Sequence, residues 1–117
     1  MAACAALLTG CGSGKADARK RAACLLDAEN AAATTVVARL YERGELGSPA
    51  VVRARYFADV DRSAYLDAHG GLKPWSELHG EAEQDLGRWI FEKLRLSSRF
   101  GDRIEAAYAR GRQAAHC

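Results

Sequence analysis

Two prolines, Pro49 and Pro74, are the only ones in the chain, and each follows glycines closely. Proline breaks a helix when it stands inside one, so these two positions mark connections between elements. The glycines that accompany them are Gly44, Gly47, Gly70 and Gly71. The rest of the chain is therefore free to form long helices, and its apolar residues recur at helical spacing.

The apolar pattern predicts four amphipathic helices. They are expected at about 18–43, 48–68, 77–96 and from Ser97–Ser98 onward. The residues expected on the buried faces are, in chain order, Leu25, Ala32, Val36 and Leu40; Val52, Tyr56, Val60 and Ala64; Leu78, Ala82, Leu86, Trp89 and Ile90; and Phe100, Ile104, Ala107, Tyr108 and Gly111. Ser48 and Pro49 are typical of an N-cap and a first helical residue, and Asp102 with Glu105 matches a capping box. Four such faces bury one another best as an all-α fold, a small antiparallel bundle of about four helices.

The length and charge of the chain limit the classes of function that it can have. The chain has 117 residues, with 17 basic and 15 acidic side chains. It is long enough for one domain with a single core, and its balanced charge gives no indication of nucleic-acid binding. The sequence also holds no apolar run long enough to span a membrane, and it suggests neither a small-molecule substrate nor a cofactor.

A glycine-rich run near the start, Gly10-Cys11-Gly12-Ser13-Gly14-Lys15, invites comparison with a phosphate-binding loop. That loop needs a glycine five positions before Gly14 and a serine or threonine directly after Lys15. The chain has Thr9 and Ala16 at these positions. A nucleotide-binding loop is therefore excluded.

The same run contains Leu8-Thr9-Gly10-Cys11, which resembles the lipobox of bacterial lipoprotein signal peptides. The resemblance implies that residues 1–10 are a signal peptide and that Cys11 is lipidated as the first mature residue. Residues 11–17 would then be a tether, and 18–117 a single helical domain. Gly12 in place of aspartate implies the outer rather than the inner membrane, with the protein on the periplasmic side.

The signal peptide departs from the usual pattern. Its apolar stretch, Ala2 to Leu8, is short, and neither lysine nor arginine precedes it. A truncated signal with an upstream start codon would account for both features. The alternative is a cytosolic helical protein in which LTGC occurs by chance.

Four cysteines, Cys4, Cys11, Cys24 and Cys117, bear on the compartment. If the lipobox is real, Cys4 leaves with the signal and Cys11 carries the lipid. Cys24 and Cys117 would then form one disulfide in an oxidising periplasm, at neighbouring ends of an up-down-up-down bundle. The alternative is that both are free thiols in a cytosolic protein.

His79 and Glu83 have the spacing of two metal ligands on one helical face. HExxH is absent and acidic neighbours surround the pair, so a surface hydrogen bond is the simpler interpretation. The chain lacks a recognisable set of catalytic residues, and we expect neither a metal site nor enzymatic activity. A small metal-dependent enzyme built on His79 and Glu83 is the rival hypothesis.

Trp75 and Phe91 are the candidate binding residues. Trp75 lies in a loop without an apolar neighbour at the local stapling position, and Phe91 lies off the helix stripe around Trp89. Each either packs on the bundle or contacts another protein. We therefore expect a lipoprotein, held at the membrane by the lipid on Cys11, that binds an envelope protein. In architecture it resembles the helical pilotins, and an exclusion lipoprotein or an inhibitor of an envelope hydrolase belongs to the same class of binders.

Overall fold

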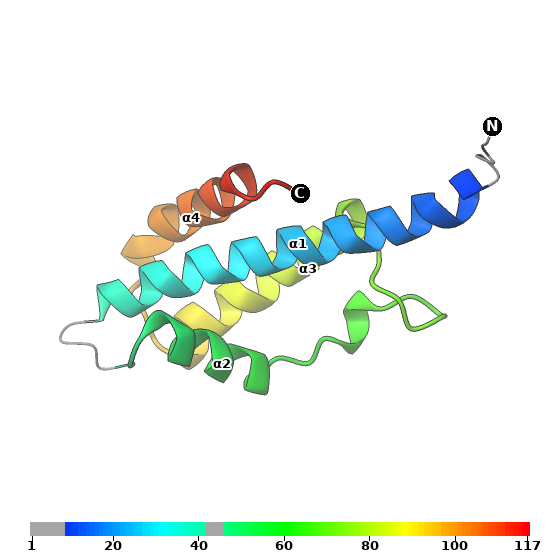
Figure 1. Cartoon of the computed structure of the whole chain (residues 1–117). Helices are drawn as coiled ribbons and strands as arrows, with labels where there is room; N and C mark the ends of the chain where they lie inside the picture. Colours follow the sequence, from blue (N-terminus) through cyan, green and yellow to red (C-terminus); the bar gives the residue numbers. More distant parts are fainter. Residues whose placement is uncertain (1–8, 42–45) are drawn as a thin grey trace.

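The computed structural model describes residues 9–41 and 46–117. Within them the chain forms four α-helices that run alternately up and down (Figure 1). The helices are α1 (Thr9–Leu40), α2 (Pro49–Asp59), α3 (Trp75–Arg88) and α4 (Gly101–Ala114). The all-α antiparallel bundle predicted from the apolar pattern is confirmed.

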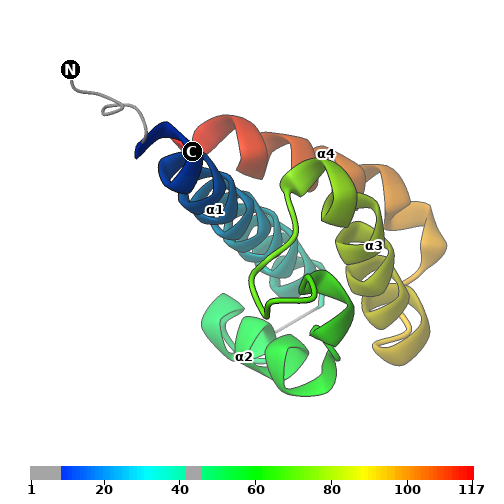
Figure 2. The same ribbon diagram turned by 90° about the vertical axis from the view of Figure 1, so that its right-hand side faces the viewer.

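Helix α1 is the spine of the bundle, and α4, α2 and α3 all pack against it (Figure 2). It begins at Thr9, so the predicted start at Ala18 was wrong, and the segment expected as a tether belongs to this helix. The predicted end at Arg43 lies outside the described residues. The first turns of α1 extend beyond the other helices (Figure 1).

The buried face of α1 is centred on Ala33 and Val37, one position later than predicted. Ala32 and Val36 are only half-buried, whereas Leu25 is buried as expected. The shift arises because α1 has neighbours on several sides rather than one. Its buried surface is therefore broader than a single stripe.

Helix α2 starts as predicted, with the Ser48 hydroxyl accepting a hydrogen bond from the Val51 amide at 3.3 Å. It ends at Asp59 and not near Ala68, because Val60 adopts an extended backbone. A strap of residues 60–74 follows, with a 3-10 turn at Ser63–Tyr65 and a bridge that pairs Leu66 with Leu72. In this strap the predicted core residue Ala64 is exposed, and Tyr65 is buried instead.

Helix α3 begins at Trp75, with Pro74 at its N-cap, and continues into a π-helical turn, η3 (Trp89–Lys93). Its predicted buried face is confirmed at all five positions, from Leu78 to Ile90. Arg95 then takes a positive φ of 63°, which turns the chain toward α4. A 3-10 turn, η4 (Ser98–Phe100), leads into α4.

Helix α4 buries Ile104, Ala107 and Tyr108, as predicted. Asp102 lies inside the first turn and does not take the N-cap position, so the predicted capping box was wrong. Gly111 faces α1 so closely that a Cβ atom there would lie 2.6 Å from the Ala28 carbonyl oxygen. A glycine is needed at this contact.

The described residues form two apolar clusters. The larger one contains Tyr56 and Trp89, whose rings meet edge to face at 5.1 Å, and the smaller one includes Leu26, Tyr65 and Leu78. Within the described part of the chain, no helix combines the length and apolarity needed to cross a membrane.

Candidate functional site

A polar network in the interior joins three helices. Glu29 on α1 is 1% exposed, and the Arg112 guanidinium on α4 donates hydrogen bonds to it and to Glu83 on α3. The Arg112–Glu83 distance is 3.0 Å. Neither Glu29 nor Arg112 was predicted from the sequence as a functional residue. The signal was present, because Glu29 falls between Leu25 and Ala33 on the apolar face of α1.

The network raises the pKa of a buried carboxyl group. Burial, followed by a hydrogen bond with Glu83, raises the pKa of Glu29 to about 9, although Arg112 acts in the opposite direction. The raised pKa favours the protonated form of Glu29, and Arg112 lies within ion-pair distance of both carboxyl groups. Glu29 itself is almost closed to solvent, and through Arg112 the network connects α1, α3 and α4.

His79 and Glu83, the pair with metal-ligand spacing, have different partners. Glu83 binds Arg112, whereas the exposed His79 ring lies 5.7 Å from the Trp75 ring. Across residues 9–41 and 46–117, no group of three or more His, Cys, Asp or Glu side chains is arranged to hold a metal ion.

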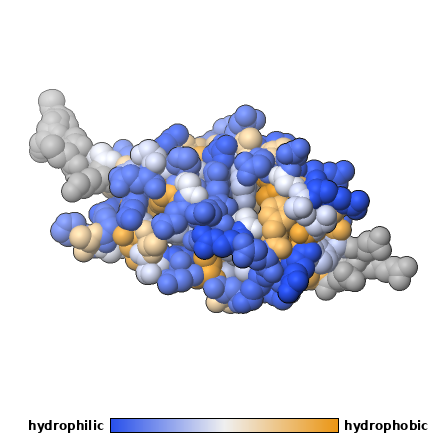
Figure 3. All heavy atoms as spheres, turned by 180° about the vertical axis from the view of Figure 1, so that it is seen from behind, coloured by the Kyte–Doolittle hydropathy of each residue, from blue (hydrophilic) through white to orange (hydrophobic). Residues whose placement is uncertain are grey.

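Trp75 and Phe91 are both half-buried. Trp75 packs against the smaller cluster at one end of the bundle, and Phe91 packs against the larger one. Phe91 also lines a groove of about 480 Å³ between α3 and α4, together with Ile104 and Tyr108. Helix α3 lies toward the back of the molecule, and on that face exposed apolar atoms gather among hydrophilic ones (Figure 3). As binding residues, Trp75 and Phe91 stay predictions.

A second, more apolar cleft of about 400 Å³ lies under the strap. It is lined by Leu26 on α1 and by strap residues that include Tyr65, Leu66 and Leu72. The strap is held at two points. The Tyr65 hydroxyl donates to the Asp85 carboxylate at 2.7 Å, and Arg19 lies 3.4 Å from Asp67.

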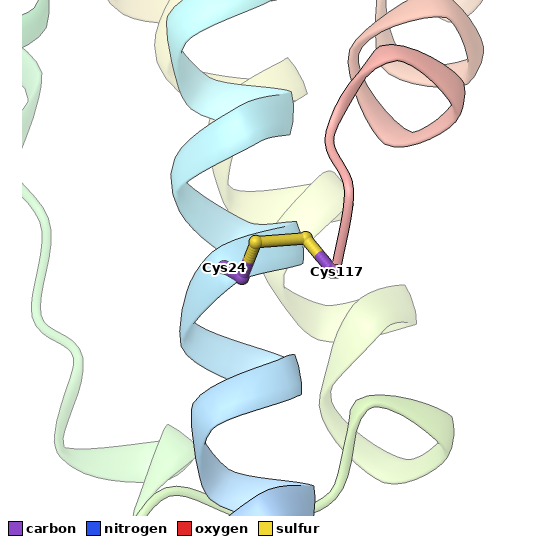
Figure 4. Close-up of a disulfide and its surroundings, with 2 residues drawn as sticks. All are labelled: Cys24 and Cys117. Carbon is purple, nitrogen blue, oxygen red and sulfur yellow. A yellow bond between two sulfur atoms is a disulfide. The ribbon is translucent and has the colours of Figure 1, made fainter.

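The two cysteines predicted to pair are joined. Cys24 on α1 and Cys117 after α4 form a disulfide, with their Cα atoms 5.8 Å apart (Figure 4). Cys11 lies in the first turns of the α1 backbone, and Leu8 lies outside the described residues. The lipidation of Cys11 therefore stays a prediction.

No family model, no curated protein and no solved structure matches the chain. The assignment of function consequently depends on the chain's own residues.

Proposed function

We propose that the chain is a small lipid-anchored lipoprotein of the cell envelope that faces the periplasm and acts by binding another protein. The observation that carries the proposal is the bridge between Cys24 and Cys117. Structural disulfides persist in oxidising compartments and are rare in the cytosol. The bridge therefore supports export, and LTGC at residues 8–11 supplies a means of attachment.

The surface supports binding rather than chemistry. The groove between α3 and α4 has an apolar floor of Phe91, Ile104 and Tyr108 and a polar rim that includes Glu92 and Glu105. Grooves of this kind between helices accept an amphipathic segment of a partner. His79 and Glu83, the basis of the rival enzyme hypothesis, have separate partners.

The first turns of α1 fit an anchored protein. They extend beyond the other helices, at the end of the bundle opposite to the one where α1 finishes (Figure 1). Lipid on Cys11 would place the bundle beyond this helical extension, with its grooves accessible from the periplasm. Several acyl chains are needed for firm attachment, which the lipoprotein class provides.

Metabolic labelling tests the anchor. The chain is expressed in a bacterial host with its native upstream region and labelled with an alkyne fatty acid. We expect the wild type and the control variant Cys4→Ser to be labelled and to fractionate with membranes. The variant Cys11→Ser should be neither labelled nor held at the membrane by lipid. An intact mass that retains an unmodified Met1, or label that persists in Cys11→Ser, would contradict the proposal.

A further inference from the structure

A groove of about 470 Å³ between α1 and α4 is lined by arginines and has a small apolar floor. We refer to it as the arginine groove. Its arginines and its apolar residues are Arg39, Arg103, Arg110, Val36, Leu40 and Ala106. Asp102 also lines it, so three positive charges face one negative charge. It is a different surface from the groove that contains Phe91.

The arginines of this groove are exposed and uncompensated. Among the residues that the structure describes, no carboxylate lies within ion-pair distance of Arg39, Arg103 or Arg110. This holds also for the carboxylate of Asp102, which lines the same groove. Arginines elsewhere on the chain are paired, for example Arg88 on α3 with Asp85 at 3.3 Å. The Arg103 guanidinium also lies 5.8 Å from the centroid of the Phe100 ring. Like charges gathered without carboxylate partners repel one another, so an incoming acidic group gains from all three.

The apolar floor adds a second requirement on the ligand. Val36 and Leu40 are half-buried and stand one helical turn apart on α1, and Ala106 lies across from them on α4. A polyanion without apolar groups would leave this floor in water. A ligand that is apolar on one side and acidic beside it satisfies both features.

The position of the groove argues against the anchoring membrane as its ligand. Val36 lies 25 residues along α1 from Cys11, which corresponds to about 38 Å of helix. The groove is at the end where α1 finishes and α4 begins, and the first turns of α1 are at the opposite end (Figure 1). A lipid surface at Cys11 is thus far from Arg103 and Arg110.

We propose that the arginine groove binds an acidic amphipathic helix of a partner protein, with leucine-like side chains on the floor and carboxylates beside the arginines. This inference deepens the proposed function and rests on its claim that the chain acts by binding protein. It does not depend on the lipid. If the chain is lipidated but does not bind acidic helices, only the inference about the arginine groove is disproved. If it binds acidic helices but carries no lipid, only the proposed lipid anchor is disproved.

The test uses the full chain, oxidised, with Cys4 and Cys11 replaced by serine. The probes are two fluorescent 18-residue helical peptides that share a leucine face and carry either glutamate or lysine beside it. By fluorescence anisotropy, we expect the glutamate peptide to bind at least about tenfold more tightly than the lysine peptide, and to weaken as salt rises.

Charge reversal locates the site. The variant Arg103→Glu/Arg110→Glu is expected to lose roughly tenfold in affinity for the glutamate peptide. The matched control, Arg21→Glu/Arg55→Glu, reverses two exposed charges elsewhere and is expected to bind as the wild type does. Melting temperatures of both variants show whether the fold is retained. The peptide comparison on the wild type needs no variant at all.

Several results would overturn the inference. Equal affinity for the two peptides would show that charge does not select the ligand, and unchanged binding by a folded Arg103→Glu/Arg110→Glu variant would place the site elsewhere. Tighter binding to a short DNA duplex or to anionic vesicles than to the glutamate peptide would identify another class of ligand. Self-association that the charge reversal abolishes would assign the groove to a second copy of the chain.

Discussion

At the scale of single residues, the most unusual group is the carboxyl of Glu29 in the interior. An ionised carboxylate in such a place costs several kcal/mol unless it is fully compensated. Arg112 is shared between two carboxyl groups, so only one of them needs to be charged. The pKa of Glu29 is accordingly raised, which links folding to pH.

The pKa of Glu29 predicts the sign of that link. In the unfolded chain a glutamate ionises near pH 4.3, whereas in the folded chain the pKa of Glu29 is about 9. Between these values the folded chain binds more protons, so the contribution of Glu29 to stability falls as pH rises. Urea unfolding should show that the free energy of unfolding of the wild type falls between pH 5 and pH 8. The fall should exceed that of Glu29→Gln, whose amide cannot ionise, by more than about 1 kcal/mol.

Two further variants complete this experiment. Glu105→Gln removes an exposed carboxyl on α4 and should leave the pH dependence of the wild type unchanged. Glu29→Ala leaves a cavity and deprives Arg112 of a partner, and should destabilise the fold by about 2–4 kcal/mol. If the wild type loses no more stability between pH 5 and pH 8 than Glu29→Gln does, then Glu29 is ionised in the folded chain.

At the scale of elements, the contact between α1 and α4 depends on one glycine. A Cβ atom at Gly111 would lie 2.6 Å from the Ala28 carbonyl oxygen and 2.9 Å from the Ala32 Cβ atom. Neither atom belongs to a flexible side chain, so Gly111→Ala should push the helices apart and cost about 1–3 kcal/mol. Thermal unfolding of the oxidised chain measures the loss.

Gly80 provides the matched control. It lies inside α3, and nothing is within 4 Å of the position where its Cβ atom would be. Gly80→Ala should stabilise the chain by about 0.5–1 kcal/mol through helix propensity alone. If the two variants shift the melting temperature in the same direction, the helices do not pack as closely as described.

The elements also show which features the sequence could predict. Helices and most buried faces follow from local spacing, and the start of α2 follows from the adjacent Ser48 and Pro49. The end of α2 was missed because the strap after it is held by distant partners, Tyr65 with Asp85 and Asp67 with Arg19. The start of α1 was missed for a different reason, since the glycine-rich run before Ala18 was interpreted as the end of a signal peptide and a tether.

The candidate sites also differ in whether the sequence could predict them. The Cys24–Cys117 pair was predicted because the resemblance to a lipobox assigns Cys4 to the signal peptide and Cys11 to the lipid, and an up-down-up-down bundle brings the two remaining cysteines to the same end. The arginine groove was not, because Arg39 and Arg110 come from helices far apart in sequence. Only the packing of α4 on α1 shows that these side chains share a surface.

At the scale of the whole molecule, the bridge closes a loop that contains α2, α3 and α4. Cross-linking residues 93 positions apart restricts the unfolded chain and typically contributes about 2–4 kcal/mol. Under oxidising conditions Cys24→Ser should therefore lower the melting temperature by roughly 10 °C or more. In reductant, wild type and variant should melt together, and a difference that persists there would assign the effect to packing of the Cys24 side chain.

The bridge also determines how the molecule responds to tension. Consider a load that enters through the start of α1 and leaves through a partner held at Arg110. In the reduced chain the unfolded path from Cys24 to Arg110 has a contour length of about 300 Å. In the oxidised chain the load passes through the bridge and the short stretch after Arg110, which extends to about 30 Å. A pull between those two points therefore cannot extend the loop that contains the other helices. The length of chain that it can extend is about tenfold shorter in the oxidised chain than in the reduced chain.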